Sequence, residues 1–197
     1  MSFLDELKGF KKDELAPTIT VVTQPTGEKV KEICGNEVVD PTCERTDGVY
    51  HNRLLHQVVD GLFIGSKDAA AYLEGLKKHS VTHILNAAIN CFNVYPDEFV
   101  YKSEPIYDQP SFDITPYLHS SADFIKDALD GGGKVLCHCA AGISRSSTLI
   151  LAYLIKWRKM SLDEGLATVR VVRPFAQPND GFMEQLKHYE AQCLLEC

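Results

Sequence analysis

The stretch that decides the fold is VLCHCAAGISRS, residues 135–146. It opens with the apolar residues of a short buried strand, passes through a loop of small residues and leads into a helix that begins at Arg145. This order is typical of anion sites, because the amides of a curled loop converge on one centre and the helix presents its positive end there. The Cys-x5-Arg spacing from Cys139 to Arg145 therefore predicts a loop that encloses a phosphate dianion.

The loop is predicted to bind phosphate mainly through its backbone amides. Gly142 allows the chain to turn and to approach a ligand closely. Arg145 adds a planar guanidinium that can donate two parallel hydrogen bonds to phosphate oxygens. The predicted substrate-binding residues are Ala140, Ala141, Gly142, Ile143, Ser144 and Arg145.

Cys139 lies at the base of this positive field and is the predicted nucleophile. Converging amides and Arg145 favour the thiolate form, which can attack the phosphorus of a bound ester. Ser146 is expected to donate a hydrogen bond to the sulfur, and His138 is expected to orient the loop rather than act as a base. Because the loop itself stabilises the charge, the sequence predicts no metal and no cofactor.

Cys137 is predicted to pack in the core, since it stands two positions before Cys139 on a strand. Taken with His138, the Cys-His-Cys triplet resembles a metal-binding cluster. However, no second group of ligands elsewhere in the sequence would complete a tetrahedral zinc site. An activated thiolate is also easily oxidised, with Cys91 and Cys137 as candidate disulfide partners.

Phosphoryl transfer also needs an acid, because the leaving phenolate or alkoxide must be protonated as its bond to phosphorus breaks. The candidate acid is Asp108, in the segment IYDQPSFDI at residues 106–114, which follows a predicted strand. Asp113 is the competing candidate, and its alternative role is to cap or complement the start of the next helix. After the first step, the ionised acid could activate water against a phosphocysteine.

The rest of the pattern alternates strands with helices. This predicts an α/β fold with a mostly parallel central sheet and helices on both faces. Strands are predicted at residues 58–64 (interrupted at Asp60-Gly61), 81–86, 99–106 and 134–138, and helices at 66–79, 115–129, 145–159, from 161 onward and 179–193. Thr115-Pro116 predicts a helix start capped by Thr115, and Ser161 with Glu164 predicts a capping box. Asn179 is predicted to cap the last helix, with the positioning of a water molecule as its alternative role. In such sheets ligands bind beyond the carboxyl ends of the strands.

The chain is predicted to consist of an N-terminal extension, residues 1–57, and a catalytic domain, residues 58–197. The extension is expected to contain a short amphipathic helix over residues 1–15, a hairpin over 18–33 with a turn at Pro25-Thr26-Gly27, and a linker.

Composition excludes several classes of protein. The chain has 197 residues, 45% of them hydrophobic, which is enough to bury a core. A net charge of −7 argues against non-specific binding of nucleic acid. Its 7 cysteines do not suit a disulfide framework, and no signal peptide or membrane-spanning run is expected. We therefore expect a soluble protein of the cytoplasm, with the nucleus as a second compartment, that binds neither nucleic acid nor membranes, and we predict no particular oligomeric state.

These residues resemble the cysteine-based protein tyrosine phosphatase superfamily, whose signature His-Cys-x5-Arg-Ser/Thr is matched by residues 138–146. The chain is similar to the dual-specificity phosphatases at residues 81–88, 108–112, 152–155 and 173–182, and the likeness covers about residues 58–193. It implies a protein tyrosine phosphatase-like fold of the dual-specificity type. It implies Cys139 as nucleophile, Arg145 as phosphate clamp, Asp108 as acid and base, Ser146 as thiolate partner, and Asn86 and His138 as supports behind the loop. For Asn86 and His138, ordinary hydrogen bonding at a strand end is the equal alternative.

The resemblance implies hydrolysis of phosphotyrosine and phosphoserine/threonine in proteins through a phosphocysteine intermediate. Residues 65–70, 76–86 and 181–186 are similar to one atypical branch, the stress-activated protein kinase pathway-regulating phosphatase. This likeness implies phosphorylated kinases of a mitogen- or stress-activated cascade as partners, although no rhodanese-like kinase-binding domain is expected within residues 1–57. Two alternatives stay open. A phosphoinositide phosphatase is disfavoured because residues 140–144 carry no positive charge, and a non-catalytic kinase-cascade scaffold because the cysteine, arginine and acid are all present.

Overall fold

The computed structural model describes residues 19–23, 29–33 and 53–195, which fall into two units, Met1–Arg45 and Thr46–Cys197. The first unit contains an antiparallel hairpin of β1 (Ile19–Thr23) and β2 (Lys29–Ile33). This confirms the two strands predicted for the extension. The helix predicted over residues 1–15, the turn at 25–27 and most of the linker lie outside the described residues.

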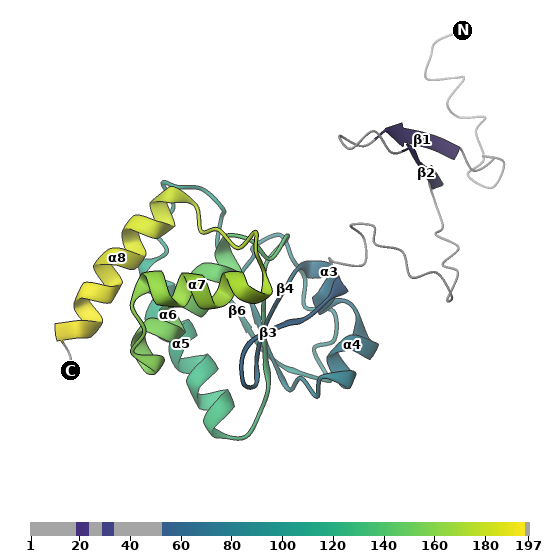
Figure 1. Ribbon diagram of the computed structural model, residues 1–197. Coiled ribbons are helices and arrows are strands. Elements are labelled where there is room, and N and C mark those ends of the chain that lie inside the picture. Colours follow the sequence, from purple (N-terminus) through teal and green to yellow (C-terminus); the bar gives the residue numbers. More distant parts are fainter. Residues whose placement is uncertain (1–18, 24–28, 34–52, 196–197) are drawn as a thin grey trace, which may run out of the picture. The chain divides into compact units, whose positions relative to one another are not determined.

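The second unit is built on a sheet of five strands in the order β3-β4-β7-β5-β6 (Figure 1). The strands are β3 (His56–Val59), β4 (Leu62–Gly65), β5 (His83–Asn86), β6 (Val100–Ser103) and β7 (Val135–His138). Strands β4, β7, β5 and β6 are mutually parallel, and only β3 pairs antiparallel, at the edge. The predicted α/β class with a mostly parallel sheet is therefore confirmed.

The strand predicted over residues 58–64 is divided at its predicted interruption, because Asp60-Gly61 forms the turn of a hairpin between β3 and β4. Gly61 adopts φ 74°, a left-handed conformation that glycine enters at little cost. The expected boundary between residues 57 and 58 falls inside β3, which begins at His56.

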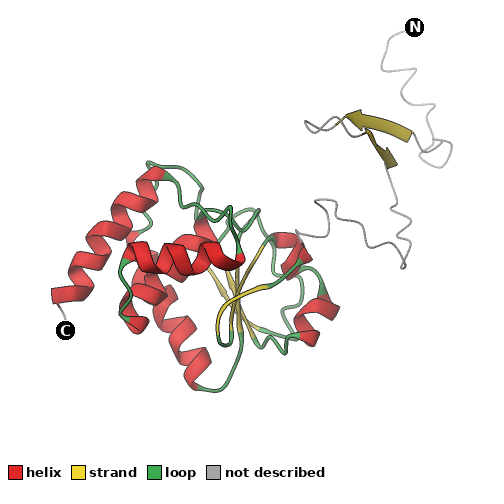
Figure 2. Ribbon diagram, in the orientation of Figure 1, coloured by secondary structure: helices red, strands yellow, loops and turns green. Residues whose placement is uncertain are grey.

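Helices cover both faces of the sheet, as predicted (Figure 2). The helices are α3 (Lys67–Ala70), α4 (Leu73–Lys78), α5 (Thr115–Asp130), α6 (Arg145–Arg158), α7 (Leu162–Val172) and α8 (Asp180–Leu195). Alternate residues of each strand point to opposite faces. Phe63, Ile84 and Leu136 pack with α3 and α4, whereas Leu85 and Cys137 pack with the larger helices α5 to α8.

Two helix starts differ from the predictions. The helix predicted over residues 66–79 is two short helices, because Tyr72 leaves the helical conformation with ψ 86° and its ring lies against Gly75. Thr115 is not the cap of α5. The cap position is Ile114, and the start is held by Asp113, whose Oδ1 accepts from Thr115 N at 3.0 Å. Both Ser66 as a cap and the Ser161–Glu164 capping box are confirmed.

Helix α6 lies in the middle of the core. Every residue from Arg145 to Ile155 is buried, so the first three turns have no solvent-facing side. The helix starts directly after the loop that follows β7, at the carboxyl end of the parallel strands. The fold therefore anchors that loop between the central strand and the most buried helix.

Candidate active site

Three loops meet at the carboxyl edge of the sheet, where the parallel strands end. Residues 139–144 follow β7, residues 104–114 follow β6, and residues 87–99 follow β5. A fourth segment, residues 173–179, joins α7 to α8 and lies against the first loop through Gln177, whose N–H donates to Ile143 O at 3.0 Å. We call residues 139–145 the phosphate loop and residues 106–114 the acid loop.

The carbonyl groups of the phosphate loop are all directed outward. Those of Ala140, Ala141, Gly142, Ile143 and Ser144 each accept a hydrogen bond from a group outside residues 140–144. The donors are the backbone N–H of Lys67, the guanidinium of Arg173, the backbone N–H of Gln177 and the N–H of Thr148 in α6. In a trans peptide the next N–H points opposite to the carbonyl. The amides that follow these carbonyls are therefore turned to the inside of the loop.

Gly142 makes this turn possible. It has φ 69°, in the left-handed region, and a Cβ there would lie 2.5 Å from the carbonyl oxygen of Gly65 and 2.8 Å from Arg173 Nη2. Only glycine fits both the conformation and the space. The turn places the N–H of Gly142 3.2 Å from Cys139 Sγ, to which it donates.

Cys139 lies at the bottom of the loop with 1% of its surface exposed. Its Sγ is 3.4 Å from Ser146 Oγ, in the first turn of α6, and it accepts from the amide of Gly142. Both groups can donate to a negatively charged sulfur. The N-terminus of α6 starts at Arg145 and adds its positive end to the same point.

Arg145 and Asp108 lie together over the loop. Arg145 Nε is 3.3 Å from Asp108 Oδ2, which is ion-pair distance, although its N–H is not aligned for a hydrogen bond. Arg145 Nη1 donates to the carbonyl of Ile106 at 3.3 Å. Asp108 Oδ1 accepts from Ser144 Oγ at 2.7 Å and from Asn179 Nδ2 at 3.0 Å. The predicted acid is therefore brought to the predicted phosphate clamp.

The acid loop is fastened to the start of α8. Gln185 Nε2 donates to the carbonyl of Phe112 at 2.9 Å, and Gln185 Oε1 accepts from Ile114 N at 2.8 Å. The backbone of Pro110 lies so close to Gly181 that a Cβ at that glycine would collide with the proline carbonyl. Asn179 completes the attachment, because it caps α8 by accepting from Phe182 N at 3.0 Å while donating to Asp108.

His138 is buried at the end of β7, and its Nδ1 lies 3.4 Å from the carbonyl of Cys139. Burial lowers the pKa of His138 to about 4, so the ring is neutral near pH 7, and the contact with the Cys139 carbonyl opposes this only in part. A buried neutral imidazole beside the carbonyl of the predicted nucleophile suits support of the loop better than proton transfer.

Asn86 makes its side-chain hydrogen bonds to the loop after its own strand. Its Nδ2 donates to the carbonyl of Cys91 at 2.8 Å and to Asn93 Oδ1 at 3.0 Å, and its Oδ1 accepts from Ala88 N. The structure therefore places the Asn86 side chain on residues 87–93 rather than on the phosphate loop.

The other cysteines near the site differ in burial. Cys137 is fully buried, burial raises its pKa well above the usual range, and its Sγ donates to the carbonyl of Ser146 at 3.6 Å. It is a core thiol, as predicted. Cys91 is half-buried, and burial followed by the nearby charge of Cys139 raises its pKa.

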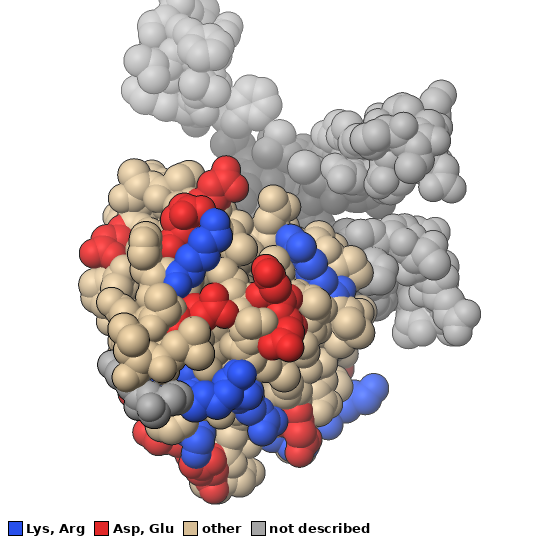
Figure 3. All heavy atoms as spheres, turned by 60° about the vertical axis from the view of Figure 1, so that its left-hand side comes forward, with Lys and Arg blue, Asp and Glu red and all other residues tan. Residues whose placement is uncertain are grey.

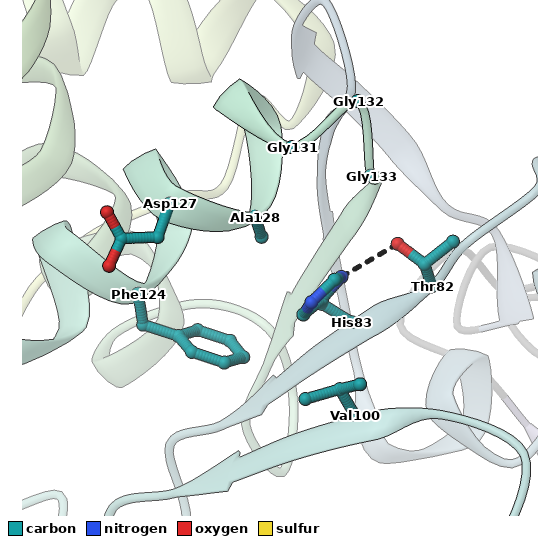
Figure 4. Close-up of a pocket in the computed structure, with 9 residues that line it drawn as sticks. All are labelled: Thr82, His83, Val100, Phe124, Asp127, Ala128, Gly131, Gly132 and Gly133. Atoms are coloured by element: carbon teal, nitrogen blue, oxygen red, sulfur yellow. Dashed lines mark hydrogen bonds between the residues drawn. The ribbon is translucent and has the colours of Figure 1, made fainter.

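A hollow of about 430 Å³ lies at the opposite edge of the sheet from Cys139 (Figure 4). It is lined by Thr82, His83 and Val100 at the starts of strands, by Phe124, Asp127 and Ala128 of α5, and by Gly131 to Gly133. His83 Nδ1 is paired with Thr82 Oγ1 at 2.7 Å, and burial lowers the pKa of His83. The hollow contains none of the predicted catalytic residues, so the candidate active site is the one at the carboxyl ends of the parallel strands.

Surface charges of both signs lie next to one another on the face drawn in Figure 3. Several basic side chains are paired in the part of the chain that the structure describes: Lys156 with Asp123, Lys187 with Glu184 and Lys126 with Asp130. No helix among the described residues is both long and apolar enough to cross a membrane.

The sequence alone does not predict two functional contacts. Arg173 stands out in the sequence only as part of a resemblance, yet it is fully buried and donates to two carbonyls of the phosphate loop. Asn179 is confirmed as a cap, but nothing in the sequence indicates its second hydrogen bond to Asp108. Both residues stand more than 30 positions from their partners, and only the Arg-Pro and Pro-Asn pairs at 173–174 and 178–179 mark the segment in the sequence.

A parallel sheet whose central strand ends in an amide-lined loop, with a cysteine at the bottom and an arginine at the rim, defines the class of cysteine-dependent phosphatases. The model of the dual specificity phosphatase catalytic domain matches residues 62–192. The mouse protein named dual specificity protein phosphatase 19 is 35% identical over 198 aligned residues, which cover 96% of this chain and 90% of that protein. The chain belongs to the dual specificity phosphatase family.

Solved structures agree with this assignment. The crystal structure of human DUSP28 superposes with a TM-score of 0.68 at 31% identity, covering 73% of this chain and 95% of that one. The crystal structure of human tyrosine phosphatase-like serine/threonine/tyrosine-interacting protein superposes with a TM-score of 0.68 at 34% identity, covering 72% of this chain and 99% of that one. The expected fold is confirmed, and the chain is a protein phosphatase of dual specificity.

Proposed function

We propose that this phosphatase works through Cys139, Arg145, Asp108 and Ser146. In the first step the thiolate of Cys139 attacks the phosphorus of a bound phosphoester, an S–P bond forms and the P–O bond to the side chain breaks. Asp108, in its protonated form, gives its proton to the leaving oxygen. The 140–145 amides and Arg145 stabilise the charge on the phosphoryl oxygens.

In the second step a water molecule attacks the phosphocysteine. Asp108, now ionised, takes a proton from that water, the S–P bond breaks and inorganic phosphate leaves. Ser146 stabilises the departing thiolate, which is supported by the 3.4 Å separation of Ser146 Oγ from Cys139 Sγ. His138 takes no part in proton transfer, because its pKa of about 4 keeps it neutral and it lies behind the loop.

One observation carries the proposal: the carbonyls of residues 140–144 all bond outward, which turns the following amides toward a point above Cys139. A ring of amides with no basic side chain inside suits one phosphate on a protein side chain. Lipid headgroups with several phosphates call for additional cations.

The test is phosphate release from a kinase activation-loop peptide phosphorylated on both Thr and Tyr, in EDTA, with Cys139→Ser in parallel. We expect release from the wild type and a loss of at least about 10⁴-fold in the variant, since the nucleophile is gone. A phosphoinositide in the same assay separates the lipid alternative. Release from the lipid alone, or release that survives Cys139→Ser, would contradict the proposal.

The substrates proposed are phosphorylated kinases of a mitogen- or stress-activated cascade. Support comes from the resemblance of residues 65–70 and 181–186 to the branch that regulates the stress-activated pathway. The place of action proposed is the cytoplasm, with the nucleus as a second compartment. This is supported by Cys91, Cys137 and Cys139, which are not joined in disulfides in the part of the chain that the structure describes.

We also propose that residues 58–197, with β3 extending them back to His56, form the catalytic domain, and that the preceding residues are an extension. Support comes from the match of residues 62–192 to the family model. Expression of residues 46–197 alone tests this, with turnover equal to that of the full chain as the expected result.

A scaffold function is the second candidate, favoured by the similarity to the human tyrosine phosphatase-like serine/threonine/tyrosine-interacting protein. A scaffold would bind phosphopeptides without turnover. Binding of the doubly phosphorylated peptide by wild type, without phosphate release, would favour it over catalysis.

A further inference from the structure

Arg173 lies directly behind the phosphate loop and has none of its surface exposed. It stands at the end of α7, and its guanidinium donates from Nε to the carbonyl of Gly142 at 2.5 Å and from Nη2 to the carbonyl of Ala141 at 2.8 Å. The ring of Phe175 covers it at 4.6 Å. The two hydrogen bonds grip consecutive peptides at the middle of the loop.

This grip differs from the other contacts that turn the loop carbonyls outward. Lys67 and Gln177 use backbone N–H groups, and Thr148 belongs to the regular ladder of α6. Among the described residues, Arg173 is the side chain that orients peptides of the loop from another part of the fold. A planar fork suits this task, because two donors in fixed relative geometry hold two acceptors at once.

Arg173 also brings a positive charge, which no carboxylate balances within the residues that the structure describes. Within the region that the structure describes, no Asp or Glu lies at ion-pair distance from it, and its Nη1 has no hydrogen-bond partner. A buried cation without a counter-ion is costly for the fold. A negative charge close by would offset that cost, and the charge that acts on Arg173 in this structure is that of the Cys139 thiolate at the start of the same loop.

We propose that Arg173 is a positioning residue of the active site, which holds the central peptides of the phosphate loop with their amides inward and stabilises the Cys139 thiolate from behind. The interaction is reciprocal. Burial lowers the pKa of Arg173, while the charge of Cys139 acts in the opposite direction and raises it. A charged cysteine that favours a charged arginine must itself be favoured by that arginine.

The inference rests on the proposed role of Cys139, and it is tested by a measurement that needs no turnover. The rate of iodoacetamide alkylation of Cys139, followed by mass spectrometry of its peptide, is measured against pH. Arg173→Met removes the charge and the fork, and Arg173→Lys keeps the charge but loses the fork. Arg170→Gln is the matched control, because Arg170 is exposed on the same helix and donates only to the carbonyl of Ala176 at 3.0 Å.

We expect the midpoint of alkylation to rise by about one pH unit in Arg173→Met, to stay near wild type in Arg173→Lys and to be unchanged in Arg170→Gln. The value of kcat/KM should fall about 100-fold in Arg173→Met and about 10-fold in Arg173→Lys, because misplaced amides lose stabilisation of the transition state. If Arg173→Met does not fold, Arg173→Lys still tests the positioning role, because its kcat/KM should fall while its alkylation midpoint stays at the wild-type pH.

Folded variants that keep the wild-type midpoint and kcat/KM would overturn the proposal. So would a variant that loses thermal stability while its midpoint and kcat/KM match wild type, since Arg173 would then be only structural. Midpoints that shift in the variants as expected, with no phosphate released by the wild type, would refute the proposed function and leave standing the inference that Arg173 stabilises the Cys139 thiolate.

Discussion

Replacing Gly181 by alanine should displace the proposed acid, Asp108, from the phosphate loop without changing Asp108 or any residue of that loop. Gly181 is in the first turn of α8, against the backbone of Pro110 in the acid loop. A Cβ there would collide with the Pro110 carbonyl oxygen and lie 2.5 Å from its carbon, whereas real Cβ contacts essentially never fall below 3.0 Å. The acid loop must therefore move by about 1 Å, and Asp108 with it.

A displacement of this size costs about 100-fold in rate when it misplaces a catalytic group, which is about 2.7 kcal/mol. The loss should depend on the leaving group. Tyrosine, with an ordinary pKa of about 10, needs a proton as it leaves, so kcat/KM on a phosphotyrosine peptide should fall about 100-fold. Nitrophenyl phosphate releases a more acidic phenol and should lose only about 10-fold or less.

The matched control is Gly131→Ala. Gly131 follows α5, and a Cβ there would lie 3.4 Å and 3.6 Å from the nearest atoms, so both substrates should be turned over at the wild-type rate. Equal losses on the two substrates in Gly181→Ala would show that the change damages the phosphate loop or the whole fold. No loss on either substrate would show that the acid loop does not depend on α8. Each result would refute the reasoning.

Three further changes have defined outcomes. Asn179→Asp keeps an oxygen to cap α8 but places a negative charge against Asp108, so kcat/KM should fall about 10-fold while the thermal unfolding midpoint stays near that of wild type. A fall in kcat/KM accompanied by a lower thermal unfolding midpoint would contradict this. Gly142→Ala places a Cβ against the carbonyl oxygen of Gly65 on a residue with φ 69°, so the free energy of unfolding, measured with denaturant, should fall by about 1–2 kcal/mol or more and most turnover should be lost. Full turnover would refute the argument that the tight turn requires glycine. The pKa of His138 is about 4 in the folded protein, below its ordinary value of 6.5. The neutral ring therefore contributes its full stabilisation above pH 6.5, and the free energy of unfolding should fall by about 3 kcal/mol as the pH is lowered from 6.5 to 4. Denaturant unfolding should show this slope in the wild type and a flatter one in His138→Gln, and identical slopes would exclude the role of His138.

The phosphate loop could be predicted because its signals are local. Small residues, one glycine and a helix start within seven positions of Cys139 leave the backbone few arrangements, and the observed strand and helix bounds agree with those predicted. The hairpin at Asp60-Gly61 is also marked locally, since Asp-Gly is a common two-residue turn. Its apolar flanks nevertheless resemble one strand, because a buried run carries no alternation to show where it reverses.

The surroundings of the site could not be predicted because they depend on packing between distant segments. The contacts of Arg173 with the phosphate loop, and of Asn179 with Asp108, join residues 31 to 71 positions apart. The start of α5 shows the same limit. A threonine before a proline has the composition of a cap, but Asp113 accepts from Thr115 N and the distant Gln185 of α8 accepts from Ile114 N, so Thr115 becomes the first helical residue instead.

The burial of Arg145 to Ile155 on all sides of α6 has a consequence for how such enzymes diversify. A helical segment without a solvent-facing side should open only when the whole domain unfolds, so the amides of these residues should exchange with deuterium at the slowest rate in the protein. Changes in Arg145 to Ile155 would therefore alter folding and chemistry together and leave little room for variation. New substrate preferences can arise instead on the rim, where Phe92, Tyr107 and Phe175 stand exposed on three separate loops. Substitutions at these exposed positions could change substrate preference while leaving the buried segment of α6 intact.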